Sequence, residues 1–598
     1  MSQSSATQQH SQVGAQVVVL DTGGQYCHLI TRKIRELGVY SEIRPSETPA
    51  SELRGVKGIV ISGGPASVYE AGSPQVDPAI FQLDAAVLGI CYGQQLIAWH
   101  LGGTVQKGSK GEYGLAYLDT SADAPIFRGI GGRQQIWMSH RDTVTQVPAG
   151  YEILGSTDTC AIAAMGHAGK RHYGVQFHPE VVHTERGRQL LSNFLFDVCA
   201  CEQDWNPRDQ APRIEDEIRR VAGDRNIFFF VSGGVDSTVA FTLCLRALGE
   251  SRVRALYVDT GLMREGETEF VSRVFESLGR NIFAVEHAQD RFLSALDGVR
   301  DPEKKRHLIG EMFVQVQQDI LESGHYLDAN WVLGQGTIYP DTIESGGTAK
   351  ADLIKTHHNR VAGIQKLISE NRLVEPLHLL YKDEVREVGQ ELGLPPELLS
   401  RHPFPGPGLA IRCLCEDAVR PLEKLDEGWL VPLHSVGVQG DSRSYRPVLL
   451  LEDAPSTPGI HHRATDLINR LPGINRVVAL AGTHAPVASL TTTEAYISAT
   501  RLDRLRAADS LVRSLCHSSG YENKVWQFPV IIVPLGTPGR PDSIVLRPID
   551  SVDGMTAQSV PMPHPLLTEM TNALLAQDGI CAVLYDLTHK PPGTIEWE

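Results

Sequence analysis

Short apolar runs alternate with helix-like patterns from Gln16 to about Cys201. The runs QVVVLD, GIVISGG, AVLGIC and YGVQF are apolar nearly throughout. Strands of this kind are typical of a mostly parallel sheet that helices cover on both faces. The polar segment EQDWNPRDQAP, from Glu202 to Pro212, breaks the pattern. We therefore predict an α/β domain over residues 15–203, followed by a boundary.

The same alternation begins again after this boundary. NIFFFV, RALYVD and NIFAVEH are strand candidates, and the apolar residues between the first two recur at helical spacing. The run HPFPGPGLAIR, from His402 to Arg412, carries three prolines and two glycines within six residues. Such a run fits neither a helix nor a central strand, so it predicts a junction. We expect a second α/β domain over residues 212–408.

The remainder, residues 409–598, has the pattern of a duplicated α+β domain. LINRLPGINRVVALAGTHAP resembles LLAQDGICAVLYDLTHKPP, with Gly473 matching Gly579 and Val477 matching Val583. An alternating, β-rich stretch precedes each copy, which predicts modules over about 430–490 and 525–598. The predicted fold class is α/β, with two doubly wound, mostly parallel-sheet domains followed by this duplicated α+β domain.

Composition excludes several classes of protein. The chain has 598 residues, 42% of them hydrophobic and 21% charged, which is ordinary for globular domains. Its net charge of −16 gives no global attraction for nucleic acid or an anionic membrane. Ten cysteines are too sparse for a disulfide scaffold and suit a reducing compartment. No apolar run is long enough to span a membrane, and the polar start, residues 1–14, is expected to be a disordered tail rather than a signal peptide. We expect a cytoplasmic (cytosolic) protein.

The first candidate site centres on Cys91. The sequence LGICYGQQ places this cysteine directly after an apolar strand, in the Gly-x-Cys-x-Gly context of a nucleophile elbow. A helix N-terminus beneath the thiol favours the reactive thiolate. YGVQFHPE supplies His178 as a base and Glu180 as its orienter, two apart on one side of an extended backbone. Backbone N–H groups of Gly64, in ISGGP, and of Tyr92 are candidates for an oxyanion hole.

These motifs, in this order, resemble the class I glutamine amidotransferases. The resemblance implies that Cys91 attacks glutamine, that ammonia leaves and that water then releases glutamate. It also implies that WMSHRD lines the glutamine pocket, because the family's residues for this substrate match Gln95, His140 and Asp142. The family more often has glycine at the position of Arg141.

The second candidate site lies in FFFVSGGVDSTVA, which predicts a strand, a glycine-rich turn and a helix. Backbone N–H groups at a helix N-terminus bind anionic oxygens, and the glycines permit close approach. No Gly-Lys-Ser/Thr follows, so the motif is not a Walker A loop. It resembles instead the PP-loop of ATP pyrophosphatases, which cut ATP between the α and β phosphates. By this resemblance Asp236 is a Mg²⁺ ligand. The matched residues that cradle the pyrophosphate are Ser232, Gly233, Gly234, Val235, Ser237 and Thr238.

Two such sites in one chain constrain the reaction. Ammonia in neutral water is mostly ammonium, which has no lone pair for attack, so a dedicated glutaminase indicates that its product reaches an acceptor sheltered from water. An acceptor oxygen becomes a good leaving group once ATP has adenylated it. The expected chemistry is amination through an adenylated intermediate, with release of AMP and pyrophosphate.

Several longer segments resemble the glutamine-hydrolysing GMP synthases over the whole chain. They are GQGTIYPDTIES, IKTHHN, VEPLHLLYKDEVREVG, RHPFPGPGLAIR, SVGVQGDSRSY and KPPGTIEWE. The resemblance implies that XMP is aminated at purine C2 to give GMP. It assigns ATP phosphates to Lys355 and Lys382, with Lys350 in a shortened lid segment. The residues it assigns to XMP are Arg306, Gly406, Asp441, Arg443, Gln527, Lys590, Ile595 and Glu596.

The implied cofactors are ATP and Mg²⁺, without zinc, flavin or haem. The adjacent His357 and His358 diverge on a helix or a strand, and no cysteine or carboxylate cluster accompanies them. The implied partners are the small molecules glutamine, ATP and XMP, with no nucleic acid and no membrane. We expect a monomer, because two modules in one chain cover the surface that a single module offers to a partner. A homodimer is the alternative.

Two rival functions stay open on the residues alone. One is a PP-loop enzyme with another acceptor, as in tRNA thiolation or NAD⁺ synthesis. The acidic net charge disfavours tRNA, and the FHPE pair disfavours the glutaminase type of NAD⁺ synthases. The other is a degenerate regulatory protein, which the intact Cys91, His178, Glu180 and Asp236 disfavour.

Overall fold

The computed structural model describes residues 14–120, 124–344, 361–399, 404–439, 442–471, 473–551 and 557–598. It contains two compact units. Unit 1 comprises Met1–Gln210 with Ile338–Ile354, and unit 2 comprises Ala211–Thr337 with Lys355–Glu598. Residues 1–13 of the predicted tail lie outside the described residues, and so do both lid lysines (Lys350 and Lys355), Asp441, and the adjacent His357 and His358.

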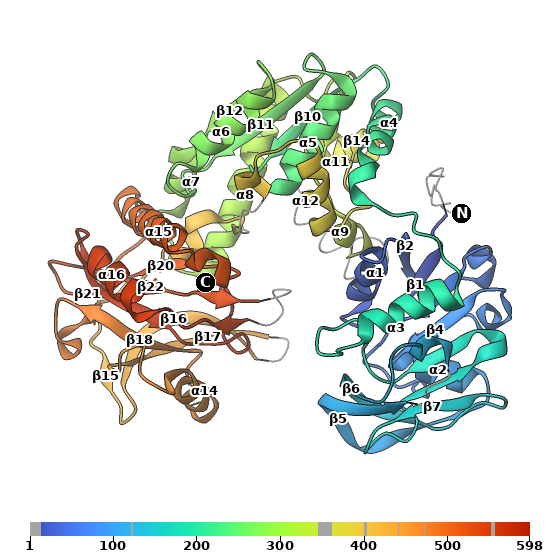
Figure 1. The fold of residues 1–598 in the computed structure, drawn as a ribbon. Coiled ribbons are helices and arrows are strands. Elements are labelled where there is room, and N and C mark those ends of the chain that lie inside the picture. Colours follow the sequence, from blue (N-terminus) through green and yellow to red (C-terminus); the bar gives the residue numbers. More distant parts are fainter. Residues whose placement is uncertain are drawn as a thin grey trace. The chain divides into compact units, whose positions relative to one another are not determined.

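Unit 1 is built on one nine-stranded sheet in the order β2-β1-β3-β4-β9-β8-β7-β5-β6 (Figure 1). The first five strands of this order are parallel, and the other four continue the sheet with antiparallel pairs. The elements of unit 1 are β1 (Val17–Asp21), α1 (Cys27–Arg35), β2 (Ser41–Pro45), β3 (Gly58–Ile61), β4 (Ala86–Ile90), α2 (Tyr92–His100), β5 (Thr104–Thr120), β6 (Arg133–Gln146), β7 (Glu152–Ser156), β8 (Ala164–His167), β9 (His172–Val175), α3 (Gly187–Asn193) and α9 (Tyr339–Glu344).

The parallel strands confirm the α/β prediction for this part of the chain. Strands β3 and β4 are buried at every position, as expected for strands covered on both faces. The antiparallel extension was not predicted. In β6 buried and more exposed positions alternate over most of the strand, the pattern of a sheet with one wetter face.

The first part of unit 2 has a five-stranded, wholly parallel sheet in the order β12-β11-β10-β13-β14. The chain moves outward from β10 in one direction and then resumes on its other side with β13. Ligands of doubly wound sheets bind at such a reversal, beyond the carboxyl ends of the strands. The elements are α4 (Ala211–Ala222), β10 (Asn226–Val231), α5 (Val235–Leu248), β11 (Val253–Asp259), α6 (Glu267–Leu278), β12 (Phe283–His287), α7 (Gln289–Leu296), α8 (Pro302–Ser323), β13 (Trp331–Gly334), α11 (Ala362–Ser369), β14 (Leu373–Val374), α12 (Lys382–Glu391) and α13 (Pro396–Leu399).

The second part of unit 2 has a seven-stranded sheet in the order β15-β16-β17-β18-β25-β22-β20. Its elements are β15 (Glu423–Lys424), β16 (Trp429–Gln439), β17 (Ser442–Leu451), α14 (Ile460–Arg470), β18 (Arg476–Thr483), α15 (Ala499–Ser519), β20 (Val530–Val533), β22 (Asp542–Leu546), α16 (His564–Leu575) and β25 (Ile580–Asp586). Two short pairs complete the strands: β19 (Thr491–Thr492) with β21 (Leu535–Gly536), and β23 (Ile549–Asp550) with β24 (Gln558–Ser559).

One apolar core joins the two parts of unit 2. Leu262 and Phe292 of the parallel-sheet part belong to the same buried cluster as Leu409, Ile532 and Val583. This shared core explains why residues on α8 can reach the C-terminal segment of the chain. Within the described residues, no helix combines the length and the hydropathy needed to cross a bilayer.

Candidate active sites

Cys91 lies on a strained turn between β4 and α2. Its φ of 54° is in the left-handed region, which is uncommon for a residue with a side chain. Two glycines permit this turn. A Cβ on Gly89 would lie 2.4 Å from the carbonyl carbon of Gly93, and a Cβ on Gly93 would lie 2.2 Å from the Ile61 oxygen. The predicted nucleophile elbow is therefore present.

We expect Gly93→Ala to disrupt this turn. The added methyl group meets the backbone of β3, which cannot move without disturbing the sheet, so overpacking should cost about 1–3 kcal/mol. Thermal unfolding of unit 1 should shift downward and glutaminase activity should fall. Gly131→Ala is the matched control, because nothing lies within 4 Å of a Cβ at that position. Equal behaviour of the two variants would contradict the close packing described for Gly93.

The other two members of the predicted triad lie just beyond β9. Nδ1 of His178 is 2.7 Å from Oε1 of Glu180, and both side chains are almost fully buried. Gly63 lies close to the side chains of both Cys91 and His178, since a Cβ there would lie 3.1 Å from Cε1 of His178 and 3.6 Å from Cβ of Cys91. Burial alone would lower the pKa of His178, but the Glu180 carboxylate and a hydrogen bond with Cys91 raise it to about 10. At neutral pH the ring is therefore protonated beside the Cys91 sulfur.

Glu180→Gln tests this electrostatic arrangement. Without the carboxylate, burial should dominate and lower the pKa of His178, so the imidazolium is lost at neutral pH. We expect glutamine-dependent activity to fall on the order of 10²–10⁴-fold, while ammonia-dependent activity persists.

The same variant changes the pH dependence of stability. The pKa of His178 is raised by folding, so its stabilising contribution is complete below the unfolded value near 6.5 and is lost as pH rises through about 10. The free energy of unfolding of unit 1, measured between pH 7 and 10, should therefore decrease with pH more steeply in the wild type than in Glu180→Gln. Parallel pH profiles of the two proteins would contradict this assignment of the pKa.

The turn that carries Gly64 is stabilised by hydrogen bonds with the hydroxyl groups of Thr22 and Ser62. Oγ1 of Thr22 donates to the Gly63 oxygen at 2.8 Å, and the Thr22 N–H donates to Oγ of Ser62. A Cβ on Gly64 would lie 2.6 Å from the Thr22 oxygen and 3.4 Å from Cδ1 of Tyr92. The two residues predicted for the oxyanion hole are thus neighbours at the nucleophile.

The three residues predicted for glutamine binding lie together beside Cys91. The side-chain amide of Gln95 donates to the backbone oxygen of Asp142 at 2.8 Å, and Nδ1 of His140 lies 3.0 Å from that same backbone oxygen. Gln176, which sequence reasoning did not single out, places its amide 3.5 Å from the Cys91 sulfur. Oδ2 of Asp142 is buried and makes no hydrogen bond among the described residues. A buried carboxylate oxygen without a partner is costly, so this atom indicates a place for a donor from a ligand.

One side-chain group among the described residues has the spacing of metal ligands. Glu112, His140 and Cys160 place ligand atoms within 4.8 Å of one another. Nε2 of His140 is 3.0 Å from Oε2 of Glu112, which is an ordinary hydrogen bond. Burial raises the pKa of the Cys160 thiol, which disfavours the thiolate that a metal needs.

The PP-loop follows β10 and leads into α5, as predicted. Gly233 has a φ of 72°, and a Cβ there would lie 2.3 Å from a methyl group of Val271, so only glycine fits. The hydroxyl of Ser237 donates to the Gly234 oxygen at 3.2 Å, and that of Thr238 donates to the same oxygen at 2.9 Å. Thr238 and Val235 are buried, and the Thr238 N–H already donates to the Gly234 oxygen at 3.2 Å.

Charged residues surround the start of α5. Nζ of Lys382, at the start of α12, is 3.5 Å from Oδ2 of Asp236. The segment after β13 packs against the loop, since a Cβ on Gly336 would lie 3.0 Å from the Ser237 nitrogen. The loop, a carboxylate and a lysine thus meet at the carboxyl end of β10, where the sheet topology places a ligand site.

Two of the residues predicted for the acceptor nucleotide, Arg306 and Glu596, lie at the C-terminal segment. The Glu596 carboxylate accepts two hydrogen bonds from Arg412, at 2.9 and 2.7 Å, and Arg306 donates to the backbone oxygen of Glu598. Lys305, fully buried, pairs with the Glu598 carboxylate at 2.6 Å. Sequence reasoning missed Arg412 and Lys305, although Arg412 ends the RHPFPGPGLAIR motif.

The remaining predicted acceptor residues are scattered around this segment. Gln527 is buried, the Ile595 oxygen accepts a hydrogen bond from Arg547 at 3.0 Å, and Lys590 exchanges backbone hydrogen bonds with Ala557. A Cβ on Gly406 would have nothing within 4 Å, so the structure shows no close approach at that turn. Arg443 lies on β17, and its side chain lies outside the described residues.

Comparison with known proteins gives matches along the whole chain. Family models match three successive regions: "Glutamine amidotransferase class-I" over residues 18–198, "NAD synthase" over 211–304 and "GMP synthase C terminal domain" over 515–597. A "Probable GMP synthase [glutamine-hydrolyzing]" of Leptospira interrogans is 41% identical over 609 residues, which cover 97% of this chain and 99% of that protein.

Two further relatives extend over the same length. The "GMP synthase [glutamine-hydrolyzing]" of Symbiobacterium thermophilum is 45% identical, and that of Caldicellulosiruptor saccharolyticus is 38% identical. Each match covers 97% of this chain and 99% of the relative. The chain therefore belongs to the family of glutamine-hydrolysing GMP synthases.

Proposed function

We propose that this chain is a glutamine-dependent GMP synthase. ATP adenylates the oxygen on C2 of XMP, and ammonia from glutamine displaces AMP, which gives GMP, AMP, pyrophosphate and glutamate. The observation that carries the proposal is the buried Cys91–His178–Glu180 arrangement within a chain that also has a PP-loop and matches glutamine-hydrolysing relatives along its whole length.

In unit 1 the Cys91 thiolate attacks the side-chain amide carbon of glutamine. The oxyanion that forms is stabilised by the N–H groups of Gly64 and Tyr92, and His178 donates its proton to the departing ammonia. Water, activated by the neutral imidazole, then releases glutamate from the sulfur. The partnerless Oδ2 of Asp142 supports a role in binding the α-ammonium group of glutamine.

In unit 2 the PP-loop binds the pyrophosphate end of ATP through the backbone N–H groups at the start of α5. The Asp236 carboxylate suits Mg²⁺, a hard cation that prefers oxygen ligands and would neutralise phosphate charge there. Lys382, beside Asp236, is placed to contact the same phosphates. The XMP oxygen attacks the α-phosphorus and pyrophosphate leaves; ammonia then adds at C2, loses its extra proton, and AMP leaves.

The acceptor is proposed to bind beside the C-terminal segment. Glu596 and the backbone at Ile595 offer acceptors for ribose or base, while Arg306, Arg443 and Lys590 supply cations for the nucleotide phosphate. Each cation alone is common on a protein surface. The assignment of these three cations to the nucleotide phosphate is supported by their position in segments that resemble the family.

An acceptor assay tests the proposal. XMP, nicotinic acid adenine dinucleotide and tRNA are offered separately with ATP and glutamine, and AMP release is measured. Release with XMP alone, with GMP as the product, is expected. Release only with another acceptor would identify the rival PP-loop enzyme. No AMP release with any of the three acceptors, whether or not glutamine is present, would favour a regulatory protein.

We further propose that the protein is a cytosolic monomer. All ten cysteines are free thiols, which suits a reducing compartment. Strands β18 and β25 pair with each other inside the chain, so the two halves of the C-terminal sheet already cover each other's inner edges. Sedimentation at micromolar concentration should give one chain per particle; a stable dimer would contradict the monomer.

A further inference from the structure

The C-terminal sheet consists of two halves with the same construction. In each half an antiparallel pair leads to a helix and then to an inner strand parallel to its neighbour: β16, β17, α14 and β18 in the first, and β20, β22, α16 and β25 in the second. The inner strands β18 and β25 are antiparallel neighbours at the middle of the sheet.

The register between these inner strands is symmetric over three consecutive pairs, before it shifts between Leu480 and Gly482. Ala479 lies opposite Tyr585, flanked by the pairs Val478↔Asp586 and Leu480↔Leu584. Aligning the halves with Gly473 on Gly579 makes Ala479 equivalent to Tyr585 and exchanges the two flanking pairs. The halves are thus related by a pseudo-twofold axis between β18 and β25.

The buried charges break this symmetry. Nη1 of Arg476, on β18, is 2.9 Å from Oδ2 of Asp586, on β25, and neither side chain is exposed. In the same alignment, however, Arg476 is equivalent to Ala582 and Asp586 to Leu480. The ion pair between β18 and β25 therefore takes one member from each half, and the equivalent place across the axis is apolar.

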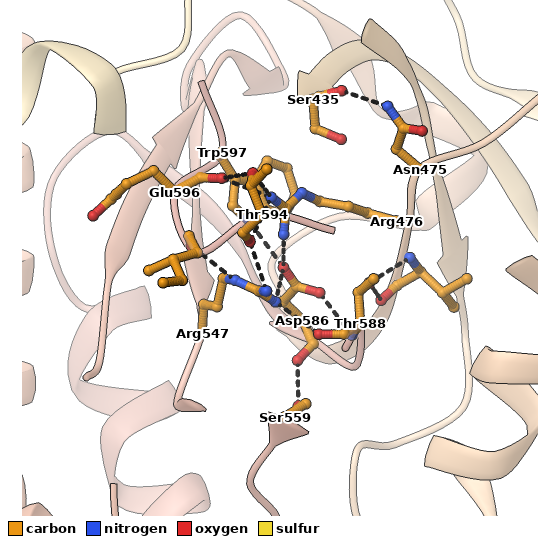
Figure 2. A network of polar contacts seen from close by, with 12 residues as sticks. Ser435, Asn475, Arg476, Arg547, Ser559, Asp586, Thr588, Thr594, Glu596 and Trp597 are labelled. Carbon is orange, nitrogen blue, oxygen red and sulfur yellow. Dashed lines mark hydrogen bonds and ion pairs between the residues drawn. The ribbon is translucent and has the colours of Figure 1, made fainter. Parts of the chain in front are cut away.

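Arg476 also holds the C-terminal segment. Its Nη2 donates to the backbone oxygen of Glu596 at 2.7 Å and to the backbone oxygen of Thr594 at 3.0 Å. Figure 2 shows Arg476 and Arg547 converging on Asp586 from two sides, with Thr594, Glu596 and Trp597 across them. Trp597 donates its indole N–H to Oδ2 of Asp586 at 2.8 Å.

Hydrogen bonds from Arg476 and Arg547 to the backbone of the C-terminal segment determine the orientation of the Glu596 side chain. Three consecutive carbonyl oxygens, those of Thr594, Ile595 and Glu596, accept hydrogen bonds from the two arginines. With the backbone fixed on one side, the Glu596 carboxylate points to Arg412.

We propose that Arg476 is a positioning residue for the acceptor site, contributed across the pseudo-twofold axis by the first half of the sheet. It fixes residues 594–597 so that Glu596 and its neighbours can receive the nucleotide, and the two halves together form one acceptor site per chain. The inference rests on the proposed function, because the nucleotide in question is XMP.

The test compares Arg476→Lys and Arg476→Ala with the wild type. Lysine retains the charge beside Asp586 but cannot donate to both carbonyls as a planar guanidinium does. Both variants keep Arg547 and Trp597 as partners for Asp586. We expect the KM for XMP to rise about 10- to 100-fold, which corresponds to the loss of charged hydrogen bonds. The KM for ATP and the glutaminase activity should stay near wild type, with kcat changed less than the KM for XMP.

Arg463→Ala is the matched control, because Arg463 lies in the same half and pairs with Asp453 at the surface. An unchanged KM for XMP in folded Arg476 variants would overturn the proposal. On the wild type itself, equilibrium dialysis should give one XMP per chain, and two per chain would also overturn it. A wild type that does not aminate XMP would instead refute the proposed function.

Discussion

Replacing Cys91 by alanine should abolish glutamine-dependent amination, by on the order of 10⁴–10⁶-fold, and leave ammonia-dependent amination largely intact. The thiolate has no substitute in this site, since Gln176 and the Ser139 oxygen, which contact the Cys91 sulfur, are not nucleophiles of comparable strength. Ammonium added at high concentration bypasses unit 1, because deprotonated ammonia is the only product that unit 2 needs.

The measurement is the rate of AMP and GMP formation from XMP and ATP, first with glutamine and then with ammonium chloride. Cys199→Ala is the control, because Cys199 is a buried thiol of the same unit whose pKa burial raises well above its usual value. Equal loss of both activities in Cys91→Ala would show that the cysteine serves the fold of the chain rather than the supply of ammonia.

Asp236→Asn should remove both glutamine-dependent and ammonia-dependent amination, on the order of 10³-fold or more. The substitution retains the size of the side chain but deletes the negative charge at the start of α5. It therefore removes the proposed Mg²⁺ ligand and the partner of Lys382 while the PP-loop backbone stays in place.

The same two assays check this result, with Asp224→Asn as the control, since Asp224 is exposed in the turn that precedes β10. Thermal unfolding of Asp236→Asn should remain close to wild type. Retention of ammonia-dependent synthesis in this variant would exclude Asp236 from the ATP site.

The local sequence predicted those parts of the sites that local geometry creates. The elbow at Cys91 and the PP-loop turn both depend on glycines within a few residues of the functional side chain, so a short motif is enough to recognise them. His178 and Glu180 were predicted as a pair from their spacing of two residues, although the structure places them in a turn just beyond β9 and not on the extended backbone that we expected.

Contacts between distant segments could not be predicted in this way. Arg412 and Glu596 are separated by 184 positions, and Lys305 and Glu598 by 293. Only the shared core of unit 2 brings α8 and the Gly408–Arg412 turn to the C-terminal segment. Nothing in the local pattern distinguishes a buried arginine that organises a site from one on the surface.

The antiparallel extension of unit 1 was missed for a different reason. Strand β6 alternates between buried and more exposed positions over most of its length, and in β5 aromatic residues such as Tyr113 and Tyr117 occupy exposed positions. Reading only continuous apolar runs as strands finds those buried on both faces and overlooks these.

The fate of the amide nitrogen of glutamine tests the account most directly. Wild-type protein is supplied with XMP, ATP and glutamine labelled with ¹⁵N in its side-chain amide, and the nucleotides are analysed by mass spectrometry. The account predicts ¹⁵N on the 2-amino group of GMP, with one AMP and one pyrophosphate formed for each GMP. Unlabelled GMP, or ATP split to ADP and orthophosphate, would contradict it.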